Sequence, residues 1–190
     1  MRKNVSAPFA GSGRERFPFR ARRADQANRA TLRQVIARGR VRAHLRPMLI
    51  GLLALALAAA FAGSALYINL VEQPARLALD DGAMLAEWRP SDRRGFAFLA
   101  ALAVAAGALG IGQYLAAKDV RWAVGALAIL ATWPYAYFVL RPMNDRILSL
   151  AGADQGAAGA YVRDWGRLEI GQTALGLASC AAYLWALTEP

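Results

Sequence analysis

Four long runs of apolar residues alternate with charged segments along this chain of 190 residues. The runs cover about residues 47–70, 95–117, 121–141 and 168–187, and their interiors carry no charged side chain. An α-helix rises about 1.5 Å per residue, so about 20 apolar residues cross the hydrocarbon core of a bilayer. The pattern therefore predicts an all-α fold with four transmembrane helices in a domain at 47–190.

Within two of these runs, small and polar residues recur at helical spacing. Because successive residues of a helix turn by about 100°, steps of three and four place side chains on one stripe. Small residues let helices approach closely in lipid, so these stripes favour an up-down-up-down four-helix bundle. The alternative is that Gly and Ala are simply common in this composition. The two stripes are Trp165, Glu169, Gln172, Gly176, Ser179 and Tyr183, and Ala103, Gly107, Gly110 and Tyr114.

The net charge of +10 comes from the N-terminal segment, since residues 1–46 hold 13 of the 23 Lys and Arg but 2 of the 13 Asp and Glu. A basic segment beside a membrane helix is a topology signal and attracts anionic lipid headgroups. It contains no recognisable base-reading module, so we expect membrane lipids and no nucleic acid as partners. We expect this tail to be largely disordered. The alternative is an artefact of the gene start, because Met48 opens the first apolar run.

Orientation follows from the distribution of basic residues. Lys118 and Arg121 lie in a short loop on the same side as the tail, which gives that side 15 Lys and Arg against 8 on the other. The positive-inside rule then predicts that both termini are cytoplasmic. We expect an integral protein of a bacterial inner membrane, and the sequence leaves its oligomeric state open.

Uncommon polar residues gather where the first and third helices end and the fourth begins. In an up-down bundle these ends lie on one side of the membrane, which predicts a shared polar pocket. Glu72 precedes Arg76 by four residues, the favoured order for an ion pair, and Pro74 is expected to loosen the helix between them. The alternative is that these charges cap helices and reach for water. The candidates are Asn69, Glu72, Arg76, Asn144, Arg146, Trp165, Glu169 and Gln172.

Residues that ligate metals or form disulfides are scarce. His44 is the one histidine and lies in the tail, and Cys180 is the one cysteine. An intrachain disulfide is therefore excluded, and histidine-ligated metals or haem are not expected in the membrane domain. The sequence predicts no metal and no cofactor.

Short motifs at the helix ends resemble the anthrone-oxygenase-like family, small four-helix membrane proteins mostly described as a domain of unknown function. The segments that carry the resemblance are Asn69-Leu-Val-Glu-Gln-Pro-Ala-Arg-Leu, then Trp88, Arg141-Pro-Met-Asn-Asp-Arg-Ile-Leu and Trp165-Gly-Arg-Leu-Glu. It covers about residues 48–187. Some members are implicated in oxidising anthrones to anthraquinones without an evident metal cofactor, and the resemblance implies a related activity for this chain.

The resemblance places Glu72, Asn144, Trp165 and Glu169 at the site. Many relatives have His where this chain has Glu169 and Arg where it has Gln172. The first functional hypothesis is a cofactor-independent oxidoreductase acting on an apolar aromatic or quinone-like molecule.

In this hypothesis Glu72 or Glu169 is the general base, and Asn144 and Arg146 stabilise the enolate. Trp88 and Trp165 flank the substrate ring. The substrate-binding set is Asn69, Arg76, Trp88, Arg146, Trp165 and Gln172. The alternative is a non-enzymatic lipid-binding or complex-associated membrane subunit. A transporter is the less favoured third option, because the helix centres lack charges.

Overall fold

The computed structural model describes residues 48–150 and 155–188. The chain divides into two compact units, Met1–Leu45 and Arg46–Pro190, and all described residues lie in the second. The expectations about the basic tail therefore fall outside the described residues.

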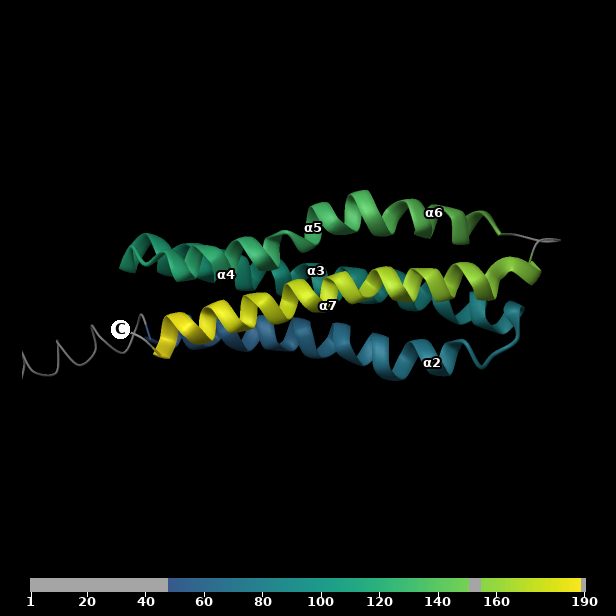
Figure 1. The fold of residues 1–190 in the computed structure, drawn as a ribbon, viewed down its shortest axis with the longest axis horizontal. Coiled ribbons are helices and arrows are strands. Elements are labelled where there is room, and N and C mark those ends of the chain that lie inside the picture. The colour runs from purple at the N-terminus through teal and green to yellow at the C-terminus, as the bar shows by residue number, and fades with distance from the viewer. Residues whose placement is uncertain (1–47, 151–154, 189–190) are drawn as a thin grey trace, which may run out of the picture. The chain divides into compact units, whose positions relative to one another are not determined.

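The described residues form four helical spans, each long and apolar enough to cross a membrane (Figure 1). The first span is Met48–Arg76, which ends in the π-helical turn η1 (Ile68–Glu72) and α2 (Gln73–Arg76). The second is α3 (Asp81–Ala117). The third, Val120–Ser149, comprises α4 (Val120–Leu130), α5 (Thr132–Tyr135), η2 (Ala136–Leu140) and α6 (Arg141–Ser149). After η3 (Gln155–Ala157), α7 (Ala158–Thr188) is the fourth. The predicted all-α class is confirmed, and the protein is a four-helix membrane protein.

The helices extend beyond the apolar runs into charged segments. α3 begins at Asp81 rather than near residue 95, the third span continues to Ser149, and α7 begins at Ala158 rather than near residue 168. Asp80 caps α3, because its carboxylate accepts from the Ala83 N–H at 2.9 Å. Charged residues end an apolar run but do not end the helical hydrogen bonding. Much of the charged segments after the first and third apolar runs is therefore helical.

The predicted stripe on α7 is the seam of the bundle, and all six of its residues are buried. Tyr183 is its centre: the hydroxyl donates to the Ala106 carbonyl at 2.9 Å. Added Cβ atoms at Gly110 and Gly125 would overlap the Tyr183 ring. These glycines therefore let α3 and α4 close on α7. On α3 the seam ends before Tyr114, which is 37% exposed.

The connection between α3 and α4 is as short as predicted. Lys118 ends α3 with a left-handed φ of 58°. Asp119 then caps α4, accepting from the Arg121 N–H at 3.0 Å. This tight reversal places α4 antiparallel to α3. α2, the start of α3, α6 and the start of α7 consequently lie at the same end of the bundle, to the right in Figure 1.

Both π-helical turns stand in the same relation to a proline. η1 ends two residues before Pro74 and η2 ends two residues before Pro142. In each case the residue before the proline donates its N–H to the carbonyl five residues back. A proline cannot donate and its ring crowds the carbonyl four residues back, which the wider π turn relieves. The loosening predicted at Pro74 is thus present, and the third span repeats it.

A break in the third span opens space beside α3. At Ala131 the helix is interrupted, and the Thr132 hydroxyl donates to the Ile129 carbonyl at 2.6 Å. Pro134 follows within α5. α4 packs closely against both α3 and α7, whereas the segment after the break stays beside α7 and diverges from α3 (Figure 1).

Candidate functional site

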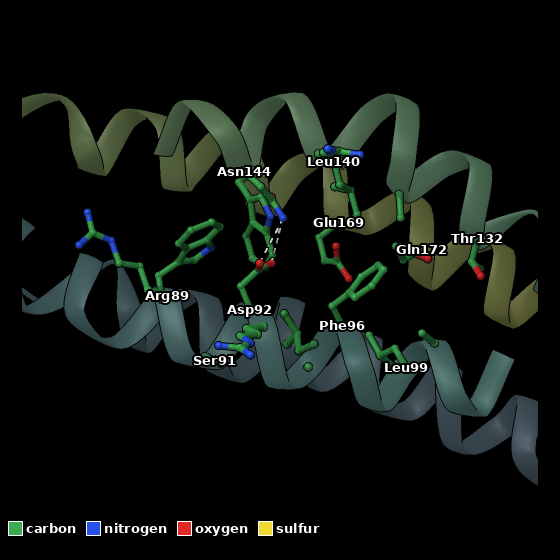
Figure 2. A pocket seen from close by; sticks show the side chains of 18 of the residues that line it. Arg89, Ser91, Asp92, Phe96, Leu99, Thr132, Leu140, Asn144, Glu169 and Gln172 are labelled. Atoms are coloured by element: carbon green, nitrogen blue, oxygen red, sulfur yellow. Dashed lines mark hydrogen bonds between the residues drawn. The ribbon is translucent and has the colours of Figure 1, made fainter. Parts of the chain in front are cut away.

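A cavity of about 590 Å³ occupies the space left by this divergence (Figure 2). Seven of the nine side chains that the sequence nominated line it, so the predicted convergence of helix ends is present. They are joined by aromatic and acidic residues that the sequence analysis did not nominate. The nominated residues are Glu72, Arg76, Trp88, Asn144, Trp165, Glu169 and Gln172, and the additions include Asp92, Phe96, Trp133, Tyr137 and Arg141.

Arg76 is the polar hub at the end of the first span, with 2% of its surface exposed. Its guanidinium forms ion pairs with Glu72, as predicted, and with Glu87 of α3. It also donates to the Gln73 side chain at 2.9 Å and to the Ser91 hydroxyl at 3.2 Å. A guanidinium presents several donors in a fixed plane, so one arginine holds the first span against α3.

Trp88 and Trp165 form one wall of the cavity. Their ring centroids lie 5.8 Å apart with planes at 88°, the edge-to-face arrangement. The Arg76 guanidinium lies 5.6 Å from the centroid of Trp165. The sequence analysis expected the two indoles to flank a substrate ring from either side. Because they contact each other, they form one wall of the cavity instead.

Glu169 is the feature of the site that packing explains least. It is 4% exposed, and among residues 48–150 and 155–188 its carboxyl group has no hydrogen bond or ion pair. Figure 2 shows it directed into the space between α3 and the third span. An ionisable side chain within a membrane span costs free energy and is a functional candidate by default.

Gln172 lies one turn further along the same face of α7 and is 6% exposed. Its side-chain oxygen is buried and has no partner among the described residues. Among the described residues, the Glu169 carboxyl group and the Gln172 amide oxygen therefore face one cavity without a partner.

Asp92 faces them from α3. The Asn144 amide nitrogen on α6 donates to both Asp92 carboxylate oxygens, at 3.3 and 3.1 Å (Figure 2). This bridge joins α3 to α6 across the gap that the divergent third span leaves. Asn144 thus holds a second carboxyl group at the cavity wall.

Buried polar atoms without partners concentrate around this cavity. In the described part of the chain there are four, and all belong to residues that line it. Folded proteins leave few such atoms unsatisfied, so a collection of them at one place indicates groups that a ligand or water completes. The four are Trp88 Nε1, Trp165 Nε1, Asn144 Oδ1 and Gln172 Oε1.

Two nominated residues lie elsewhere. Asn69 donates to the Thr173 hydroxyl at 2.8 Å and so joins the first span to α7. Arg146 is exposed and outside the cavity lining, because two residues from Asn144 a helix has turned by about half a circle. Arg141 lines the cavity instead, with its guanidinium 5.1 Å from the Tyr137 ring centroid.

The additional cavity residues follow helical spacing that the sequence analysis overlooked. Trp88, Asp92 and Phe96 recur every four residues along the start of α3. Trp133 and Tyr137 are likewise four apart and lead to Arg141. The first set was missed because Trp88 and Asp92 lie in an arginine-rich segment that precedes the predicted helix at 95–117, so their register with Phe96 was not considered.

Metal-ligating side chains do not cluster in the described part of the chain: no group of three or more His, Cys, Asp or Glu residues there has a geometry that could hold a metal ion.

Comparison with known proteins identifies the fold's relatives at the family level. The family model for anthrone oxygenase matches residues 88–182. No curated protein and no solved structure matches the chain. The matched segment is half of the chain and runs from Trp88 on α3 through the third span to Ala182 on α7, which together supply most of the cavity lining. The chain therefore belongs to the anthrone oxygenase family.

Proposed function

We propose that this protein is a membrane-embedded oxidoreductase that uses dioxygen to convert an apolar anthrone-like phenol into the corresponding quinone, without a cofactor. The observation that carries the proposal is Glu169, a buried residue whose carboxyl group has no hydrogen bond or ion pair among the described residues and faces a cavity lined by aromatic residues. Family membership supports the substrate class.

The cavity has the size and lining of a small-molecule site. Ligand pockets are mostly about 300–1,000 Å³ and largely apolar, with a few polar groups that fix orientation. The volume of about 590 Å³ falls in this range, and Phe96, Trp133 and Trp165 supply aromatic lining suited to a flat fused-ring molecule. Such a substrate partitions into the bilayer, and Phe96 and Trp133 are exposed on the surface of their spans, where the substrate would enter.

Glu169 is the better base of the two glutamates. Glu72 is committed to Arg76 and accepts from the Ser91 hydroxyl, whereas Glu169 has neither kind of partner among the described residues. A general base of this type contributes roughly 10²–10⁴-fold to the rate. Gln172, one turn away, is placed to donate its amide to the oxygen on which the enolate charge develops. It takes the role that the sequence analysis gave to Arg146.

The chemistry balances with dioxygen alone as the oxidant. Glu169 removes a proton from the methylene carbon that lies opposite the carbonyl in the central ring, leaving an enolate. The enolate gives two electrons to dioxygen as a carbon–oxygen bond forms, which yields a peroxide. Loss of the second carbon-bound proton and cleavage of the oxygen–oxygen bond then give the quinone and one molecule of water.

A lipid-binding subunit is the second candidate. The exposure of Phe96, Trp133 and Tyr137 at the rim favours it, because an acyl chain fits the same opening. Native mass spectrometry of the purified protein separates the two: a bound aromatic or quinone-type molecule supports the oxidoreductase, and lipid alone supports the subunit.

The decisive assay supplies anthrone and ¹⁸O₂ to the purified protein in detergent. The proposal expects one dioxygen consumed per quinone formed, one heavy oxygen atom in the quinone, and loss of turnover in Glu169→Gln. Quinone formation at the rate of the protein-free control would contradict it.

We also infer that both termini face the cytoplasm, from the excess of Lys and Arg on their side. The cavity then opens near the opposite face of a bacterial inner membrane.

A further inference from the structure

Four acidic residues line the cavity, and two of them have a cationic partner among the described residues. Glu72 pairs with Arg76, and Asp145 lies 4.0 Å from Arg141. Asp92 and Glu169 have no ion pair among the described residues, although arginines line the same cavity. The site thus leaves two carboxyl groups available to whatever enters it.

The two available carboxyl groups come from different helices. Asp92 projects from α3 and Glu169 from α7, and both are directed into the space between α3 and the third span (Figure 2). Asp92 is held by Asn144, which reaches it from α6 at 3.1 and 3.3 Å. A flat molecule lying between these two side chains would have one carboxyl group on each side of its plane.

A methylene carbon in a flat ring has the matching geometry, because its two hydrogen atoms project from opposite faces of the ring. Oxidation to a carbonyl removes both hydrogens. One base on one wall reaches only the first of them without rotation of the substrate. The second hydrogen faces the other wall.

We propose that Asp92 is a second catalytic base, which removes the second carbon-bound proton and thereby triggers cleavage of the oxygen–oxygen bond. This inference rests on the proposed function and adds a residue and a step to it. Asn144 is the positioning residue that aims the Asp92 carboxylate.

The steps balance as follows. Glu169 takes the first proton, and dioxygen adds to the same face as a peroxide anion. Protonated Glu169 returns its proton to the peroxide and gives a hydroperoxide. Asp92 takes the remaining carbon-bound proton, the carbonyl forms, and the oxygen–oxygen bond breaks with release of hydroxide. Hydroxide takes the proton from Asp92 and leaves as water, so both carboxylates are restored.

A purely structural role makes a different prediction. If Asp92 and Asn144 only tie α3 to α6, Asp92→Asn changes stability and leaves the mixture of products unchanged. If Asp92 is the second base, Asp92→Asn stalls the reaction after dioxygen has added. An amide at position 92 retains a hydrogen bond to Asn144, so the bridge between the helices persists.

The test compares full-length wild type, Asp92→Asn, Glu169→Gln and Asp164→Asn in detergent with anthrone as the probe. Asp164→Asn is the matched control, because Asp164 is an exposed residue of α7 that pairs with Arg167 outside the cavity. Dioxygen uptake is followed with an electrode. Hydroperoxide and quinone are quantified by mass spectrometry after acid quenching.

We expect Asp92→Asn to lower quinone formation by roughly 100-fold while dioxygen uptake in the first turnover stays within about threefold of wild type. A product heavier than the substrate by one dioxygen should accumulate. Glu169→Gln should lose both activities, and Asp164→Asn neither.

Three outcomes overturn the inference. If the wild-type protein takes up no dioxygen, both the proposed function and the Asp92 step are wrong. Active wild type whose Asp92→Asn variant loses uptake and quinone in equal measure, or keeps both, leaves the proposed function standing and removes Asp92 as the second base. Each variant is first checked for a wild-type gel-filtration profile and unfolding midpoint.

Discussion

Glu72 and Glu169 line the same cavity, but among the described residues only Glu72 has a cationic partner. The Arg76 guanidinium neutralises Glu72, and nothing among the described residues does the same for Glu169. Removal of the Glu72 carboxylate therefore tests the stability of the fold, and removal of the Glu169 carboxylate tests the proposed chemistry.

Replacement of Glu169 by Gln should remove turnover without loss of stability. The isosteric amide cannot accept a proton, so the rate should fall by roughly 10²–10⁴-fold. The thermal unfolding midpoint in detergent should not fall, because no ion pair or hydrogen bond of Glu169 among the described residues is lost. A Gln variant that unfolds much earlier than wild type would show that Glu169 has a structural role.

Glu72→Gln is the complementary change. It weakens an ion pair to the buried Arg76 and should lower the free energy of unfolding by about 1–2 kcal/mol, since Glu87 still neutralises the guanidinium. Turnover at saturating substrate should stay near wild type. Loss of turnover with unchanged stability would move the base from Glu169 to Glu72.

Arg76 should be the polar residue on which stability depends most. Arg76→Leu leaves Glu72 and Glu87 without their cation and should cost about 3 kcal/mol, the low end for a broken buried pair because Glu87 is 39% exposed. Arg76→Lys should fall between wild type and Leu, since an ammonium cannot reproduce the planar set of donors. Equal stability of all three forms in detergent unfolding would refute the hub.

The close approach of α3 to α7 depends on Gly110. A methyl group there would overlap the Tyr183 hydroxyl and disturb its hydrogen bond to Ala106, so Gly110→Ala should destabilise the bundle by about 1–3 kcal/mol. Gly112→Ala is the matched control on the same helix, because nothing lies within 4 Å of an added Cβ. It should be neutral or stabilising by up to about 1 kcal/mol. The same loss in both variants would mean that helix propensity, not packing, is being measured.

The turn between α3 and α4 predicts a pH effect. Hydrogen bonds from Arg121 hold the pKa of Asp119 below its ordinary value of 3.8. A lowered pKa in the folded state adds stability that is present above the ordinary value and is lost as the pH falls through the lowered one. Asn also caps helices, so Asp119→Asn should be less stable than wild type at neutral pH and equal to it in strong acid. If the two proteins differ in stability by the same amount at both pH values, ionisation of the Asp119 carboxylate is not the cause.

Orientation can be read by labelling single cysteines at Asp81 and Gly156, in a chain with Cys180 replaced by Ala. Both positions lie at the cavity end of the bundle. We expect membrane-impermeant maleimide to reach them from outside intact cells. Labelling only after the cytoplasmic side is opened would reverse the assignment.

The sequence predicted the parts of this site that depend on periodicity. The α7 stripe from Trp165 to Tyr183 is buried because a helix repeats its faces at fixed intervals and small residues had to meet another helix. The pairing of Glu72 with Arg76 followed from the same spacing. The sequence analysis did not nominate Asp92, because the neighbouring Arg89, Pro90 and Arg93 are more typical of a loop. In the structure α3 continues through them.

Other features depend on which side chains compete for one partner. Arg76 is shared between Glu72 and Glu87, and no local sequence pattern shows that Glu169 lacks a cationic partner among the described residues. The Asp92–Asn144 bridge joins residues 52 positions apart and depends on the divergence of the third span. Such relationships can be recognised only in the packed structure.

Proton abstraction by Glu169 can be measured directly, before dioxygen takes part. Under anaerobic conditions in D₂O, wild-type protein should exchange the methylene protons of anthrone for deuterium well above the rate in buffer and detergent alone. Glu169→Gln should exchange at the background rate, and Glu72→Gln close to wild type. Exchange by Glu169→Gln as fast as by wild type, or no exchange above background by wild type, would contradict the assignment of Glu169 as the base.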